Sequence, residues 1–225
     1  MKPRSIALAV ALALLGTSSQ ASLIDRGSGL IYDADLGITW MSNASLSVTR
    51  TFGAAGTINA TGTMSWLTAQ NWIGAMNAQA YLGFNNWRLP DTLYPDPSCS
   101  AVSGGQNCTG SEMGHLFYDE LGGLAGHDIA DVHNSNYALF QNIQNNQYWS
   151  RTTFTQNPQI SNDNAWVFLF PGGVQQTIAV ENFNAVWAVR NGDVLPAAIP
   201  EPADLALIAV GVLGLAILRR QRKAS

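Results

Sequence analysis

The chain has 225 residues and a formal net charge of −4, which is enough for one ordinary domain whose core folds without metals or a disulfide network. Between residues 22 and 199 there are five arginines, no lysine and thirteen acidic residues, a net charge of −8. Nucleic-acid binding needs clustered Lys and Arg, so nucleic acid is excluded as an expected partner.

The first 21 residues have the pattern of a secretory signal peptide. Lys2 and Arg4 precede an uncharged apolar run over 6–15, and Ser19-Gln20-Ala21 follows as a small-x-small cleavage site. We therefore expect the mature chain to start at Ser22 and to meet an oxidising compartment.

The body, residues 22–195, predicts an α+β fold of two helices and short antiparallel strands. Ser65 is the expected N-cap of a helix through Ala78, with Trp66, Ala69, Ile73 and Met76 on one stripe. Ser111 is the expected N-cap of a second helix through Leu121, with Met113, Leu116 and Phe117 inward. Pro171-Gly172-Gly173 predicts a hairpin turn, and the expected strands are 30–33, 38–41, 87–89, 148–150, 165–170, 176–180 and 185–189.

The two cysteines, Cys99 and Cys108, lie in a stretch rich in Pro, Ser and Gly. In an exported chain this pattern favours a local disulfide. The alternative, a metal pair, lacks the C-x-x-C spacing and a second pair of ligands.

The densest polar segment runs from His127 to Asn136. The imidazoles of His127 and His133 would suit a transition metal. The alternative is Ca²⁺, whose candidate ligands are oxygen atoms of Asp128, Asp131, Asn134 and Asn136. The spacing matches neither an EF-hand loop nor H-E-x-x-H, and a solvated loop is the simpler interpretation.

Trp87-Arg88-Leu89-Pro90 has two interpretations. Trp and Arg can bind a ligand by stacking and by a forked hydrogen bond. Alternatively, Trp87 is buried, Arg88 pairs with an acidic neighbour such as Glu112, and Pro90 ends a strand, which explains each residue. We favour the second interpretation.

Catalytic motifs are sparse. The sequence contains no G-x-S-x-G and no phosphate-binding loop. Glu112 and His115 stand three residues apart on the second expected helix and form the only acid-base pair that we single out, together with the 127–133 loop. A hydrolase is therefore an alternative, and we expect that the protein is not an enzyme.

The tail, residues 196–225, changes composition. Prolines mark an extended linker, the apolar run 205–218 carries no charge, and Arg219, Arg220, Arg222 and Lys223 follow it. Fourteen residues are short for a membrane span, so hydropathy alone leaves a buried core helix open. The position at the chain end, before a basic cluster, favours a transmembrane helix with its C-terminus in the cytoplasm.

Pro200-Glu201-Pro202, the apolar helix and the Arg-rich end together resemble the PEP-CTERM sorting signal. The resemblance implies export by a Gram-negative bacterium, an inner-membrane intermediate and cleavage near Pro-Glu-Pro by an exosortase-type transpeptidase. It also implies a final place at the cell surface or in the extracellular biofilm matrix. A permanent single-span anchor is the alternative.

A series of motifs across the body resembles the Lcl C-terminal domain family. The resemblance implies a C-type-lectin-like fold and adhesion to glycans. Many relatives carry a cysteine in the helix before Trp-Arg-Leu-Pro, where this chain has Asn77, Ala78 and Ala80. The motifs are Gly37-Ile38-Thr39-Trp40, Asn86-Trp87-Arg88-Leu89-Pro90, Glu112-Met113-Gly114-His115-Leu116, Tyr148-Trp149-Ser150-Arg151-Thr152, Ala165-Trp166-Val167-Phe168 and Trp187-Ala188-Val189-Arg190.

The same resemblance extends to a ligand site. Asn162, Asp163 and Asn164 stand just before an expected strand, where lectin-like domains place carbonyl donors that hold Ca²⁺ and sugar hydroxyls. We expect a non-catalytic domain that binds a glycan or an envelope protein, with Ca²⁺ as the one cofactor suggested. The charge of −8 favours neutral sugars or proteins over sulfated glycans. A purely structural matrix protein is the remaining alternative.

Overall fold

The computed structural model describes residues 23–102, 104–154 and 164–194. Within these ranges the chain is a mixture of helix and sheet in which strands outnumber helices, as the α+β prediction requires. None of the helices in these ranges is long and apolar enough to span a bilayer. Several predictions fall outside the described residues: the signal peptide, Asn162, Asp163, Pro200-Glu201-Pro202, the apolar helix 205–218, and Arg219, Arg220, Arg222 and Lys223.

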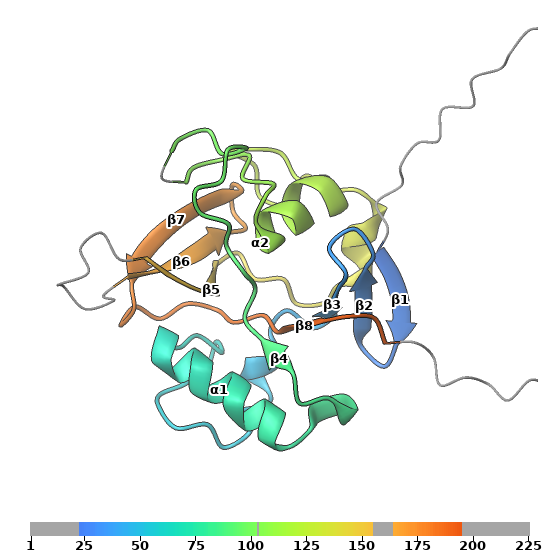
Figure 1. The fold of residues 1–225 in the computed structure, drawn as a ribbon, viewed down its shortest axis with the longest axis vertical. Helices are drawn as coiled ribbons and strands as arrows, with labels where there is room; N and C mark the ends of the chain where they lie inside the picture. Colours follow the sequence, from blue (N-terminus) through green and yellow to red (C-terminus); the bar gives the residue numbers. More distant parts are fainter. Residues whose placement is uncertain (1–22, 103, 155–163, 195–225) are drawn as a thin grey trace, which may run out of the picture.

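The larger sheet joins the beginning and the end of the body (Figure 1). Its order is β1-β2-β3-β8-β4, and every neighbouring pair is antiparallel. β1 was not predicted because it has no buried face: its residues are exposed or only partly buried, and two of them, Asp25 and Arg26, are charged. The strands are β1 (Leu23–Gly27), β2 (Leu30–Asp33), β3 (Ile38–Met41), β4 (Trp87–Arg88) and β8 (Val189–Asn191).

The smaller sheet is an antiparallel meander of β5 (Gln147–Phe154), β6 (Asn164–Leu169) and β7 (Val174–Ala179). The predicted turn at Pro171-Gly172-Gly173 is confirmed, since Leu169 pairs with Val174 across it. Gly173 has φ +66°, and a Cβ there would lie 2.4 Å from the Tyr118 hydroxyl. Only glycine fits this turn.

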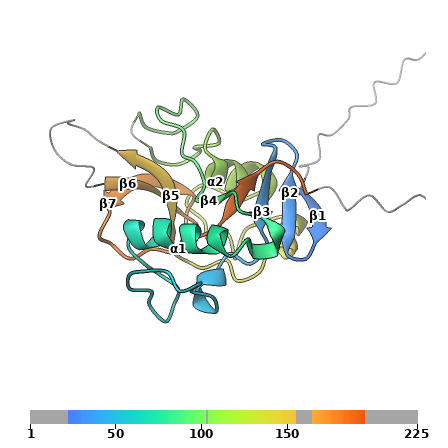
Figure 2. The same cartoon turned by 60° about the horizontal axis from the view of Figure 1, so that its bottom comes forward.

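The predicted helix from Ser65 is confirmed as α1 (Trp66–Ala78). The Ser65 hydroxyl accepts a hydrogen bond from the Thr68 amide, which satisfies one of the free N–H groups of the first turn. α1 lies beside β4 (Figures 1 and 2). The Asn77 side chain pairs with the backbone N–H and C=O of Trp87, both at 2.8 Å. The Asn77 amide therefore fastens α1 to β4.

The second predicted helix is shorter and less regular than expected. α2 (Glu112–His115) continues directly into the π-helical turn η3 (Leu116–Glu120). The Ser111 hydroxyl does not cap it, because that oxygen accepts a hydrogen bond from the Leu93 amide at 2.9 Å. The three residues predicted to face inward are buried. The 3₁₀ turns are η1 (Leu46–Val48), η2 (Tyr81–Gly83) and η4 (Ser135–Leu139).

The predicted strand 185–189 is wrong in extent. β8 begins only at Val189, while Ala185 makes an isolated bridge to Tyr148 in the smaller sheet. The backbone hydrogen bonds of this stretch pass from one sheet to the other, since Trp149 N–H donates to Ala185 and Met41 N–H donates to Ala188. The run is apolar because it crosses the core between the sheets.

Aromatic side chains fill that core. The Trp187 ring contacts Trp40, Phe140, Tyr148 and Phe170 at centroid distances of 5.3 to 5.6 Å. All the tryptophans except Trp66 are buried, and Trp66 is half-buried. The buried tryptophans therefore form part of the hydrophobic core, and the faces of their rings are not free to stack on a ligand.

Candidate functional site

Arg88 forms a structural clamp with Glu112, as the second interpretation of the Trp-Arg-Leu-Pro motif predicts. Its two terminal nitrogens donate to the two Glu112 oxygens, each at 2.7 Å, in a bidentate pair. The same guanidinium donates to the Asn191 side chain at 2.9 and 2.6 Å. Glu112 also accepts a hydrogen bond from the Asp91 amide. Because Arg88 lies in β4, Asn191 in β8 and Glu112 in α2, this group of contacts ties the three elements together.

His115 belongs to a different cluster, with Asp33 and Glu120. His115 Nε2 lies 3.3 Å from Glu120 Oε1 and 3.9 Å from Asp33 Oδ1. On the other side of the ring, Nδ1 lies 3.1 Å from Asp119 Oδ2. The side chains of Asp33 and Glu120 are 0% and 1% exposed, so two carboxylates and one imidazole share a buried space.

The electrostatics of this cluster favour bound protons. Burial raises the pKa of Asp33, against the hydrogen bond from the Leu36 amide and the charge of His115, which lower it. Burial alone would lower the pKa of His115, but the hydrogen bond with Glu120 and the charges of Asp33 and Asp119 outweigh it and raise that pKa. Protonated His115 thus offsets part of the buried negative charge.

The thermal stability of the metal-free protein is expected to decrease as the pH rises. Because the pKa of His115 is higher in the folded state than its usual value of 6.5, protonation of His115 stabilises the fold at low pH, and this stability is lost as the pH rises through the raised pKa. The raised pKa of Asp33 has the same sign: its contribution to stability is lost as the pH rises above about 3.8. Melting temperatures in EDTA between about pH 6 and pH 9 measure the effect. His115→Asn should flatten the slope and exposed His127→Asn should not. A wild-type melting temperature that rises over this interval would contradict the prediction.

The proposed acid-base pair is not assembled. Glu112 is committed to Arg88, and His115 is committed to Asp33, Asp119 and Glu120. Three-residue spacing put the two side chains on one helix, but the partners that each one meets in the fold are different. The arrangement of the described residues therefore does not support general acid-base catalysis by these two groups.

The candidate Ca²⁺ ligands of the 127–136 loop are occupied with local contacts. Asp128 accepts hydrogen bonds from the Ala130 amide and the Asn145 side chain. Asn134 accepts from the Asn136 amide and donates to the Glu120 carbonyl at 2.8 Å. Asp131 is exposed. Through the Asn134 hydrogen bond to the Glu120 carbonyl, the loop satisfies the last residue of η3, which is a structural role.

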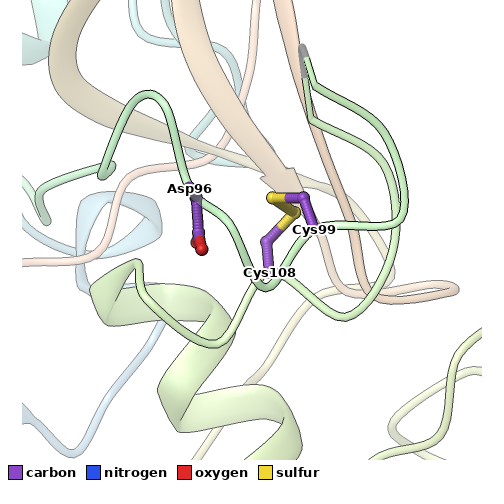
Figure 3. Close-up of side chains that lie close together, drawn as sticks. All are labelled: Asp96, Cys99 and Cys108. Atoms are coloured by element: carbon purple, nitrogen blue, oxygen red, sulfur yellow. A yellow bond between two sulfur atoms is a disulfide. The ribbon is translucent and has the colours of Figure 1, made fainter.

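Cys99 and Cys108 are joined, with an S–S distance of 2.10 Å. Asp96 lies beside them, and Figure 3 shows the three side chains together. Since the sulfurs are bonded to each other, they are not thiolates and do not offer metal ligands in this state. The predicted disulfide is therefore present in the structure, and the metal pair is not.

A second cluster, the aromatic corner, lies at the smaller sheet and consists of Tyr94, Phe154 and Trp166. Their ring centroids are 5.1 to 5.6 Å apart. The Tyr94 residue is 43% exposed, whereas Trp166 is buried. Asn164, the one described member of the predicted Asn-Asp-Asn site, is the strand partner of Phe154. The corner therefore combines the exposed Tyr94 ring with the partly buried Phe154 ring, whose strand neighbour is Asn164.

Polar atoms lie just beneath this surface. A pocket of about 460 Å³ is lined by residues 95–97 and 99–102. Asp96 Oδ2, Trp166 Nε1 and Gln175 Oε1 are buried and have no hydrogen-bond partner within the described part of the chain. Gln175 also contacts the disulfide, its side-chain amide lying 3.7 Å from Cys99 Sγ. Buried polar atoms are normally paired, so each of these three atoms is an exception, and one of them belongs to Asp96 in the pocket lining.

Asp33 and Glu120 were missed from the sequence, although one signal was available for Glu120. The helical spacing that puts Met113, Leu116 and Phe117 inward also puts position 120 on the same face. A carboxylate on an apolar stripe indicates a buried partner. Asp33 gave no such signal, because it stands at a strand end before a turn, where Asp is common.

Comparisons of the chain with protein-family models, with curated proteins and with solved structures find no match.

Proposed function

We propose that this chain is an exported, exosortase-sorted protein of the cell surface or biofilm matrix of a Gram-negative bacterium. Its body acts as a non-catalytic, C-type-lectin-like domain that binds a neutral glycan or an envelope protein. The signal peptide, the Pro200-Glu201-Pro202 tail and the Lcl-like motifs support this proposal from the sequence. The disulfide between Cys99 and Cys108 is consistent with folding outside the cytoplasm.

The observation that carries the proposal is the separation of the body's ends from its aromatic corner. Arg26 in β1 forms a bidentate pair with Asp193, which follows β8, at 2.9 and 2.5 Å. β1 and β8 both lie in the larger sheet. Tyr94 packs against Phe154 of β5 and Trp166 of β6, and Figure 1 shows these strands of the smaller sheet on the opposite side of the molecule from β1. A body attached to the cell surface through its chain ends, at β1 and β8, therefore presents the aromatic corner away from that surface.

The aromatic corner has the composition of a site for an uncharged ligand. Tyr combines an apolar ring face with a hydroxyl, and a sugar offers both C–H groups and hydroxyls to such a residue. The unpaired Asp96, Trp166 and Gln175 atoms add acceptors and a donor near the pocket. The net charge of −8 of the body disfavours anionic ligands.

A glycan array probed with the purified protein, with and without Ca²⁺, tests the binding function. We expect sugar-specific binding that Tyr94→Ala weakens about tenfold or more, because truncating an aromatic hot-spot residue costs about 2 kcal/mol or more and a tenfold loss of affinity corresponds to about 1.4 kcal/mol. Phe183→Ala is the matched control, since Phe183 is similarly exposed at 44% but lines a different groove. Turnover of a glycan would favour the hydrolase, and the absence of any binding would favour a structural matrix protein.

Processing is expected at both ends of the chain. Surface-located protein should begin at Ser22 and lack the segment from Arg219 to Ser225, because a sorting enzyme that recognises Pro-Glu-Pro separates the body from the apolar helix. Intact-mass spectrometry of protein from the native cell surface measures both ends. Recovery of most molecules with Arg219–Ser225 attached would reject cleavage and favour a permanent anchor.

A further inference from the structure

Asp33, His115 and Glu120 come from three elements and converge on one point. Asp33 ends β2, His115 ends α2, and Glu120 ends the π-helical turn η3. One nitrogen or oxygen atom from each lies within 4.8 Å of the corresponding atoms of the other two. The cluster is separate from the aromatic corner, and neither the Arg88 clamp nor the proposed binding function uses it.

One atom of this cluster is unsatisfied. The residue Glu120 is 0% exposed, and its Oε2 atom has no hydrogen-bond partner in the chain segments that the structure describes. Oε2 shares its carbon with Oε1, which faces His115 Nε2, so the unpaired oxygen is at the edge of the same space. A buried carboxylate oxygen without a partner is costly because it has lost its hydration without gaining a hydrogen bond, which calls for a cationic partner.

His115 is oriented as a metal-binding histidine would be. Its Nδ1 lies 3.1 Å from Asp119 Oδ2, so this carboxylate stands on the Nδ1 side of the ring. In the tautomer that carries its N–H at Nδ1, the Nε2 lone pair is directed at Asp33 and Glu120. Metal-ligating histidines commonly donate their second N–H to a carboxylate, which fixes the tautomer. Without a cation between them, an Nε2 lone pair facing two carboxylates would be repulsive.

We propose that Asp33, His115 and Glu120 form a site for a divalent transition-metal ion, best suited to Zn²⁺. Two carboxylates and a neutral imidazole neutralise a charge of +2. Bonds of about 2.0 to 2.1 Å to a tetrahedral ion place neighbouring ligand atoms about 3.3 Å apart; the distances from Nε2 here are 3.3 and 3.9 Å. Ca²⁺ fits less well, since it takes six to eight oxygen ligands.

The site has a route for the ion and a structural role. The His115 side chain is 14% exposed, so the cluster lies close to the surface, and water would be the fourth ligand of a tetrahedral ion. A bound ion cross-links β2 of the larger sheet to α2 and η3. Protonated His115 is the competing cation, and the experiment below separates the two.

Isothermal titration of the full chain, stripped with EDTA, with ZnCl₂ tests the proposal. We expect one Zn²⁺ per chain, a higher melting temperature with Zn²⁺, and a visible absorption band when Co²⁺ replaces it. Glu120→Gln, which removes the charge but keeps the shape, should abolish all three signals. Asp119→Asn should weaken Zn²⁺ binding about 10- to 100-fold, because it alters only the group that orients His115.

The matched control is His127→Ala, which removes an exposed histidine and should leave the titration unchanged. Zn²⁺ binding by Glu120→Gln with wild-type stoichiometry and affinity would overturn the proposal, as would the absence of binding to the wild-type chain. Either result would leave a protonated His115 as the cation of the cluster. Circular dichroism of Glu120→Gln establishes that a lost signal is not a lost fold, and Asp119→Asn, a half-exposed position, provides an independent reading.

Discussion

Arg88→Ala is expected to lower the free energy of unfolding by about 3 kcal/mol. The change removes a bidentate ion pair and leaves Glu112 without its cation, and breaking a buried pair in this way costs about 3 to 5 kcal/mol. We expect the lower end because the two side chains remain 13% and 15% exposed, so water partly solvates the carboxylate. Two hydrogen bonds to Asn191 are lost as well. At about 2 to 4 °C per kcal/mol, the melting temperature should fall by about 6 to 12 °C.

Arg151→Ala is the matched control for this experiment. Arg151 also forms a bidentate pair, with Asp91, but the side chains are 49% and 37% exposed. An exposed pair contributes about 0 to 1 kcal/mol, so this variant should melt close to the wild type. If Arg88→Ala melted within about 2 °C of the wild type and at the same time lost ligand binding, Arg88 would be a binding residue and the clamp interpretation would be wrong.

Removing the disulfide is expected to cost up to about 2.7 kcal/mol. That value is the chain entropy of a ten-residue closed loop between Cys99 and Cys108. The loop keeps other anchors, because Gly105 and Gln175 exchange two backbone hydrogen bonds at 2.8 Å beside β7. We therefore expect the double Cys→Ser variant to fold with a melting temperature about 5 to 11 °C below that of the oxidised wild type.

Non-reducing peptide mapping and melts with and without a reductant measure this effect. The reductant should lower the melting temperature of the wild type toward that of the Cys99→Ser, Cys108→Ser variant and should not change the variant. Two free thiols in freshly isolated protein would refute the disulfide. In that state Cys99, Cys108 and nearby Asp96 would again be candidate metal ligands.

Much of the local structure follows from short stretches of sequence. β2 and β3 begin and end where short apolar runs predict them, and α1 begins after Ser65 because a hydroxyl N-cap and a stripe of apolar residues are both local features. The Pro171-Gly172-Gly173 turn is local in the same sense, and Cys99 and Cys108 are too close in the chain to need a fold to bring them together. Such features are encoded within one or two turns of backbone.

The pairing of Arg88 with Glu112 was also predictable, but for a different reason. A buried arginine requires an acidic partner, and the body contains few acidic residues near a predicted helix start. The sequence could not show that Asn191 would complete the clamp, because β8 reaches β4 only through the order of the larger sheet. The strand prediction at 185–189 was wrong in extent for a related reason. This run is apolar because it is buried between the two sheets, and a buried central strand has the same apolar pattern.

The sequence by itself therefore determined the local elements, the charge of the body and the disulfide. Apart from the Arg88–Glu112 pair, only the tertiary structure decided which distant polar groups meet. Asp33 and His115 are 82 positions apart in the chain and approach to 3.9 Å because the fold brings the last residue of β2 to the end of α2. Glu112 and His115 share a helix but face different partners, since sheet order and the π-helical turn place Arg88 beside one and Asp33 beside the other. Contacts between distant segments depend on packing of the whole chain, which no local pattern encodes.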